Sequence, residues 1–208
     1  AMYSLRAKGM PLGVKIPHSS LHLHGKLLVT EHDIYNWMVR NPDRPKWFDN
    51  MVSRAKNPDD FRVINRKLAG AMIARRMGWW DFEVSGSGWY TPPEVNVEVK
   101  STVAMARDAY LSSKRAWHPL AALVVDSDSL LSLQHSDECG QAKYLLDDLV
   151  REIARSGVPF DSYLARDFDC HPEIMSSYKA VLRYTSQTPK MDADAIRRFV
   201  SDKGGYVP

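Results

Sequence analysis

The sequence predicts an α+β fold, in which a mixed or antiparallel central sheet is flanked by helices and followed by a helical C-terminal region. Three observations predict it. Short runs of β-forming residues alternate apolar and polar side chains, as half-buried strands do. Other segments repeat apolar residues at helical spacing, and the last third of the chain is mostly helical in pattern. Apolar residues make up 44% of the 208, which is enough for a packed core.

The N-terminal quarter predicts an arm, a strand and a helix. Residues 1–19 are basic and interrupted by Gly and Pro, which favours an extended arm. Residues 20–30 alternate aliphatic side chains with His and Lys, which predicts a half-buried strand. Residues 33–40 predict a short helix that ends before a proline. Residues 41–60 contain three prolines and predict a loop.

The middle of the chain predicts the order helix, strand, strand, helix, strand. Residues 61–77 have an apolar stripe at helical spacing, followed by a glycine stop. A strand that opens at Asp81 and a strand that ends in residues 98–100 flank a turn rich in Gly, Ser and Pro. Residues 103–117 predict a helix, and residues 120–125, which read LAALVV, predict a buried strand.

The C-terminal part predicts three more helices, at about residues 138–156, 172–185 and 192–203. Together the patterns indicate an extended basic arm at 1–19, an α/β core at 20–135 and a helical C-terminal region at 136–208 that packs on the core.

Composition limits the class of protein. The net charge is only +3, so the total charge does not indicate a nucleic-acid binder, although a locally basic face can still bind phosphate. The two cysteines, Cys139 and Cys170, are too few for a disulfide framework and favour a reducing, intracellular setting. No apolar run reaches the roughly 18 residues of a membrane span.

One group of residues indicates metal-dependent chemistry. On a strand, residues two apart face the same way, so Glu98 and Lys100 are expected to project together, and a hairpin would bring Asp81 beside them. Two carboxylates and an ammonium can hold a divalent metal ion and activate a water molecule.

The sequence VEVKST at 97–102, together with the element order around it, resembles the PD-(D/E)XK nuclease superfamily. The resemblance is confined to residues 61–126, and Trp80 stands before Asp81 where the family has proline. It implies that Asp81 and Glu98 bind Mg²⁺ and that Lys100 orients the attacking water. We therefore expect a Mg²⁺-dependent nuclease that hydrolyses phosphodiester bonds in a nucleic acid.

The helix predicted at 61–77 offers a phosphate-binding surface for such a substrate, because it carries five basic residues and no acid between them. Trp89, in the loop that follows, is expected to stack on bases. The expected nucleic-acid contacts are Arg62, Arg66, Lys67, Arg75, Arg76 and Trp89.

Two alternatives stay open at this stage. The basic arm and exposed aromatic residues would also suit a non-enzymatic, self-associating viral structural protein, of the matrix or nucleocapsid type, that binds RNA or an acidic membrane surface as a homo-oligomer. Separately, four histidines within fifteen residues form either a polar strand face or a transition-metal site completed by Glu31 or Asp33. These histidines are His18, His22, His24 and His32.

Overall fold

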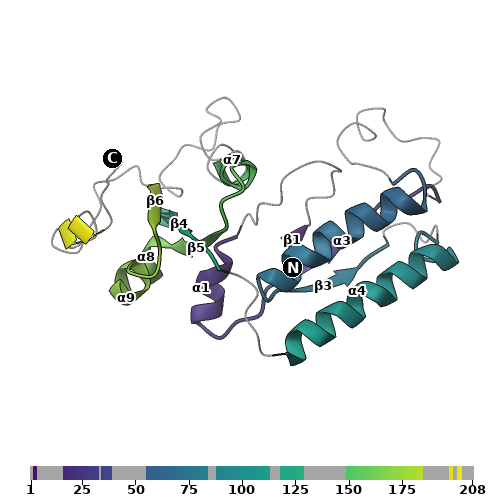
Figure 1. The fold of residues 1–208 in the computed structure, drawn as a ribbon, viewed down its shortest axis with the longest axis horizontal. Helices are drawn as coiled ribbons and strands as arrows, with labels where there is room; N and C mark the ends of the chain where they lie inside the picture. Colours follow the sequence, from purple (N-terminus) through teal and green to yellow (C-terminus); the bar gives the residue numbers. More distant parts are fainter. Residues whose placement is uncertain are drawn as a thin grey trace. The chain divides into compact units, whose positions relative to one another are not determined.

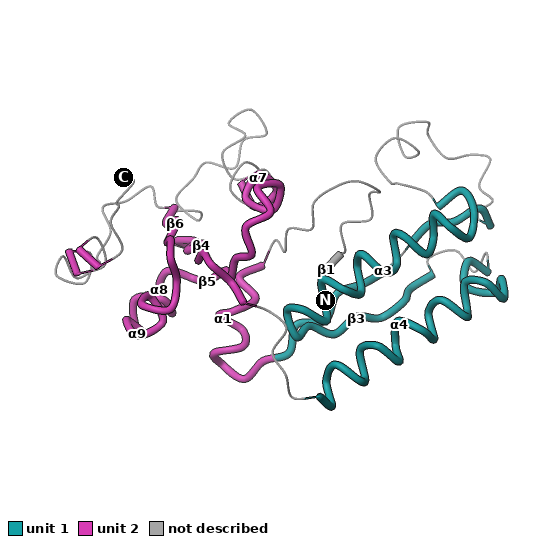
Figure 2. The backbone as a smooth tube through the Cα atoms, viewed as in Figure 1, with its two compact units in different colours: residues 1–12, 27–117 teal, residues 13–26, 118–208 magenta. Residues whose placement is uncertain are grey.

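Two three-stranded sheets, in which all strands are parallel, organise the chain (Figure 1). Each sheet belongs to one of two units (Figure 2). Unit 1 contains residues 1–12 and 27–117, and unit 2 contains residues 13–26 and 118–208. The chain therefore leaves unit 1 early, contributes a short segment to unit 2, and returns before its second half completes unit 2.

The structure is a computed structural model. It describes residues 2–3, 16–32, 34–38, 55–83, 88–112, 118–128, 149–184, 197–198 and 201–202.

Unit 1 alternates strands with helices. Its elements are β1 (Met2–Tyr3), β2 (Val29–His32), α3 (Pro58–Ala74), β3 (Gly78–Asp81) and α4 (Pro93–Leu111). The strands lie in the order β1-β2-β3, and the pairing of β2 with β3 runs from Val29 beside Gly78 to His32 beside Asp81. Because the strands run the same way, their carboxyl ends meet at one edge of the sheet.

The two long helices of unit 1 start where their sequences favour it, and they pack on each other. Asn57 caps α3 by accepting a hydrogen bond from the Asp60 N–H at 2.9 Å. Pro58 and Pro93 occupy the first turns, where a missing N–H costs no helical hydrogen bond. The helices share a core with the segment after β2, formed by Ile34, Ala55, Phe61, Ile64, Leu68 and Val95.

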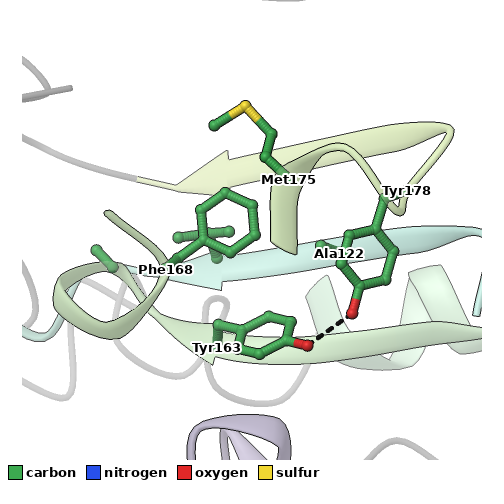
Figure 3. Close-up of a cluster of buried hydrophobic side chains, with 7 residues drawn as sticks. Ala122, Tyr163, Phe168, Met175 and Tyr178 are labelled. Carbon is green, nitrogen blue, oxygen red and sulfur yellow. Dashed lines mark hydrogen bonds between the residues drawn. The ribbon is translucent and has the colours of Figure 1, made fainter. Parts of the chain in front are cut away.

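Unit 2 is built around β4, its central strand. The elements of this unit are α1 (His18–Leu23), β4 (Ala121–Val125), α7 (Leu149–Arg155), β5 (Phe160–Leu164), α8 (Ala165–Cys170), α9 (Pro172–Met175) and β6 (Ala180–Tyr184). The strand order is β5-β4-β6. Ala122 and Val124 of β4 point into a cluster formed with α8 and α9 (Figure 3), whereas Ala121 and Leu123 point into a second cluster with Val150 of α7. Both faces of β4 are thus buried, as parallel sheets require.

The predicted fold class is wrong. The described strands form parallel sheets that alternate with helices, an α/β architecture, and not a mixed or antiparallel sheet. A hairpin needs two strands adjacent in sequence, but β2 and β3 are separated by the whole of α3. The helix predicted at 61–77 and the strand predicted at 120–125 are confirmed, as α3 and β4.

The predicted strand that ends in residues 98–100 is wrong, because these residues lie within α4. The alternation of Val95, Val97 and Val99 with polar residues is typical of a strand, and it misled the sequence prediction. Of these three valines, only Val95 is buried in the helix, and Val97 is 68% exposed. Pro92 and Pro93, which stand at the cap and the first position of α4, favour the helical alternative.

Other segments also differ from expectation. Residues 20–30 contain the end of α1 and the start of β2 rather than one strand, and residues 34–38 are not helical. The helix predicted at 172–185 is short α9 followed by strand β6, so the C-terminal region is not simply helical. Of the helix predicted at 138–156, residues 149–155 are confirmed as α7, and the first part lies outside the described residues, as does most of 192–203.

None of the helices that the structure describes combines the length and apolar character needed to cross a membrane.

Candidate active site at the carboxyl ends of β2 and β3

Three ionisable side chains lie where β2 and β3 end. Glu31 and His32 close β2, and Asp81 closes β3. In the sheet register Glu31 lies beside Trp80, and His32 lies beside Asp81. Neighbouring residues in register on parallel strands project to the same face, so His32 and Asp81 share one face and Glu31 shares the other with Trp80.

His32 is completely buried and uncharged. Its ring stacks on that of Trp79, with the centroids 5.6 Å apart. Neither ring nitrogen has a hydrogen-bond partner among the described residues. Burial lowers the pKa of His32 from 6.5 to about 4, because a charged imidazolium would lose its hydration there. At neutral pH the imidazole is therefore uncharged, and its protonation would cost free energy.

The pKa of Asp81 is shifted in the opposite direction, upward. Its Oδ1 atom is buried and has no hydrogen-bond partner within the described part of the chain. Burial raises the pKa of Asp81 from 3.8 to about 6, since the carboxylate is poorly hydrated. A fraction of Asp81 is thus protonated near neutral pH and can donate a proton, which an ordinary exposed aspartate cannot do.

The other face of the strand ends combines a carboxylate with an aromatic surface. Glu31 is only 9% exposed, and no described residue forms a hydrogen bond or ion pair with its carboxylate. Trp80, beside it in the sheet, is 45% exposed and stacks on Phe82 with the ring centroids 5.2 Å apart. This face therefore offers a flat apolar platform next to a negative charge.

The segments that follow the two strands are fixed to each other. Tyr90 donates a hydrogen bond from its hydroxyl to the His32 carbonyl at 2.8 Å, and Asn36 donates from its side chain to the Trp89 carbonyl at 2.5 Å. The Glu83 carboxylate accepts from the N–H groups of Gly88 and Trp89, the latter at 2.9 Å. Such cross-links hold the strand ends in one arrangement, as a catalytic site requires.

The structure does not bring the predicted metal-binding residues onto one strand face. Asp81 ends β3, but Glu98 and Lys100 lie two residues apart on α4 and therefore project on nearly opposite sides of the helix. Glu98 is buried, and Arg66 donates to both of its carboxylate oxygens, at 2.7 and 3.0 Å. The contact raises the pKa of the Arg66 guanidinium. Lys100 is exposed.

The five basic residues predicted to contact nucleic acid lie on α3 or directly after it, and their side chains differ in exposure and partners. Arg62 pairs with Asp59 at 2.7 Å, and Arg75 is buried. Lys67 is half-buried, and burial lowers the pKa of its ammonium. Arg66 is engaged by Glu98, and Arg76, the residue after the α3 cap, is exposed.

Trp89 is completely buried, with its ring centroid 4.4 Å from that of Tyr35. Stacking of a base on this indole is therefore incompatible with the observed packing.

The four histidines are divided between the two units. His18, His22 and His24 belong to unit 2, and His32 belongs to unit 1. His24 pairs with Asp167 at 3.0 Å. Among the described residues, no three His, Cys, Asp or Glu side chains are grouped as metal ligands would be.

Sequence reasoning considered Glu31 and His32 only as metal ligands. The available signal was a pair of polar residues that ends a β-forming run, in the sequence VTEH at 29–32. Its meaning depends on knowing that the strand is parallel, because only then do the strand ends collect at one edge.

Comparisons with protein-family models, with curated proteins and with solved structures find no match to this chain. Its function must therefore be inferred from the chemistry of the site.

Proposed function

We propose that unit 1 carries the acid–base site of a hydrolase that cleaves a glycosidic bond at the carboxyl ends of β2 and β3. The observation that supports this proposal is the set Glu31, His32 and Asp81, which end adjacent parallel strands and whose side chains have no hydrogen-bond or ion-pair partner among the described residues. Parallel α/β proteins place their sites at this edge. Unpaired, poorly hydrated ionisable groups are unfavourable for folding, and they concentrate where chemistry needs them.

The two carboxyl groups suit complementary roles. Asp81, with its pKa raised to about 6, is the general acid that protonates the leaving-group oxygen. Glu31 is the second carboxylate, which attacks the anomeric carbon or activates the water that does so. Because their side chains start from opposite faces of the sheet, a bond that lies across the strand ends would have one carboxyl group on each side.

The surroundings favour an uncharged substrate. Trp80 and Phe82 provide a flat apolar surface against which the C–H face of a sugar ring can pack. A phosphodiester would meet repulsion from Glu31 at short range unless a metal ion intervened. A sugar, with apolar faces and an uncharged ring, avoids this repulsion and uses the platform.

A hydrolysis assay with a panel of nitrophenyl glycosides tests the proposal. We expect the unaltered chain to release nitrophenol from at least one glycoside, and Glu31→Gln or Asp81→Asn to lower the rate by at least about 100-fold. Glu94→Gln, at an exposed acid in the first turn of α4, is the matched control and should keep full activity. Equal rates for Glu31→Gln and the control would refute the assignment.

The two earlier hypotheses, a Mg²⁺-dependent nuclease and a viral structural protein, remain predictions that no comparison tests. The nuclease hypothesis requires Glu98 to exchange Arg66 for a metal ion. Cleavage of plasmid DNA or RNA with Mg²⁺ that is lost in Glu98→Gln would support it. The structural-protein hypothesis requires large concentration-dependent oligomers, which sedimentation would detect.

A further inference from the structure

The side of α4 that faces away from α3 is apolar, whereas the solvent face of a helix is normally polar. α4 packs along α3 (Figure 1), and Val95 is among its buried residues. On the opposite side lie Val97, Ala104 and Leu111, which are all exposed, Val97 by 68% and Leu111 by 66%. Residues seven apart are separated by roughly two turns, so these three residues form one line along the helix, here called the outer stripe.

Charged residues flank the outer stripe, with a different sign on each side. Helical spacing places Lys100 and Arg107 on one side and puts the two acids, Glu94 and Asp108, on the other. All four are exposed, and their side chains form no hydrogen bond or ion pair within the described part of the chain. None of them has an opposite charge three or four positions away on α4, so the helix cannot pair them internally.

The other long helix of unit 1 lacks this pattern. Of the large apolar residues of α3, only Val63 is exposed. Arg62 of α3 pairs with Asp59 at 2.7 Å. Arg66 likewise pairs with Glu98. An apolar line with unpaired charges of opposite sign on its two sides therefore distinguishes α4 from α3, and it is not a general property of an exposed helix.

We propose that the outer stripe is the contact surface of a dimer, in which α4 lies parallel to α4 of a second copy of this chain. In a parallel pair related by a two-fold axis, each side of one stripe meets the opposite side of the other. The basic side thus meets the acidic side twice, and Arg107 lies beside Asp108 of the second copy. An antiparallel pair would instead bring basic side against basic side. Charge complementarity therefore selects both the occupant and its orientation.

The apolar contacts agree with this arrangement. In the parallel pair Val97, Ala104 and Leu111 each meet the same residue of the second copy, and the small side chain of Ala104 lets the helices approach closely. The stripe is only roughly 21 Å long, so the dimer is expected to be weak and to form with rising concentration. A two-fold contact closes at two copies and does not build larger assemblies. This inference is independent of the proposed glycoside chemistry.

Sedimentation velocity of the full chain over a range of concentrations tests the proposal. We expect the unaltered chain to show a monomer–dimer equilibrium, and Leu111→Lys to raise its dissociation constant at least about tenfold, because an ammonium would enter the stripe. Tyr110→Lys is the matched control. Tyr110 is 87% exposed, but it lies about 100° around the helix from Leu111 and off the stripe. The control should stay within about twofold of the unaltered chain.

Reversal of charge tests the orientation. In the parallel dimer, Arg107→Glu places two carboxylates side by side at both symmetric contacts and should weaken association about fivefold or more. The variant Arg107→Glu/Asp108→Arg restores opposite signs, and its dissociation constant should return to within about twofold of the unaltered chain. In an antiparallel dimer, Arg107→Glu would relieve repulsion between the basic sides and strengthen association.

A chain that stays monomeric at all concentrations would overturn the proposal and would assign the stripe to a partner of another kind. Stronger association of Arg107→Glu, or no recovery in the double variant, would overturn it as well. Dissociation by Tyr110→Lys but not by Leu111→Lys would place the contact elsewhere and overturn it. Because the substituted residues are exposed, the variants should fold, which circular dichroism checks. Recovery in the double variant is a result that misfolding could not produce.

Discussion

His32 and Asp81 are expected to change the stability of unit 1 with pH in opposite directions. The pKa of His32 is lowered from 6.5 to about 4, so between these values the unfolded chain binds more protons than the folded one. Its contribution to stability is complete above pH 6.5 and is lost as the pH falls to about 4. At roughly 1.4 kcal/mol per pH unit, this amounts to about 3 kcal/mol.

For Asp81 the change of stability with pH has the opposite sign. Its pKa is raised from 3.8 to about 6, so the folded chain binds more protons in that interval, and stability is lost as the pH rises through about 6. The carboxyl group is only partly buried, so we discount the effect to at most about 2 kcal/mol. In the unaltered chain the two contributions nearly cancel between pH 4 and 6.

Single substitutions separate the contributions of His32 and Asp81 to the pH dependence of stability. With His32→Asn, the free energy of unfolding should fall by up to about 2 kcal/mol from pH 4 to pH 6.5, and with Asp81→Asn it should rise by about 3 kcal/mol. Urea unfolding followed by tryptophan fluorescence measures this, because all six tryptophans lie within residues 37–117 and report on unit 1. His118→Asn, at an exposed residue of unit 2, is the control. Two variants with the same pH slope as the unaltered chain would refute the reasoning.

Three further predictions concern the fold. Val95→Lys should destabilise unit 1 by at least about 2 kcal/mol while Val97→Lys changes stability by less than about 0.5 kcal/mol, as measured by urea unfolding; equal costs would mean that this segment is not helical. Asn57→Ala removes the α3 cap and should cost about 1 kcal/mol, and an unchanged midpoint would contradict the cap. Tyr178→Phe leaves buried Asp161 without its 2.7 Å donor and should cost about 1–3 kcal/mol in thermal unfolding, whereas a neutral effect would show that the bond is absent.

The sequence was sufficient for elements whose pattern fits only one structure. The stripe of Ile64, Leu68 and Met72 has a helical period, and it was assigned correctly. The run LAALVV is too short and too apolar for anything but a buried strand. The direction of strand pairing could not be predicted in this way, because a local pattern does not show which distant segment pairs with a strand.

The segment 95–100 shows why local pattern fails where two periods coincide. Alternating valines fit a strand, and two of the same valines, Val95 and Val99, also fit one face of a helix. The choice is made by tertiary contacts, here the packing of α4 on α3 and the Arg66–Glu98 pair. The strand assignment also underlies the predicted metal site, since the family resemblance depended on Glu98 and Lys100 sharing a strand face.

The candidate site was only partly predictable for the same reason. Asp81 was identified from its place at a strand, and the partners predicted for it, Glu98 and Lys100, lie on α4. Glu31 and His32 lie about fifty residues before it in sequence, and only the parallel pairing of β2 with β3 places them beside it. The chemistry of a strand end therefore follows from topology more than from local motif.

The central claim is that the reacting carboxylate is Glu31 at the strand ends and not Glu98 on the helix. Parallel measurement of glycoside hydrolysis by Glu31→Gln and Glu98→Gln, both confirmed as folded by tryptophan fluorescence, tests it most directly. The account predicts loss of hydrolysis in the first variant and retention in the second. Full activity in Glu31→Gln together with its loss in Glu98→Gln would contradict it.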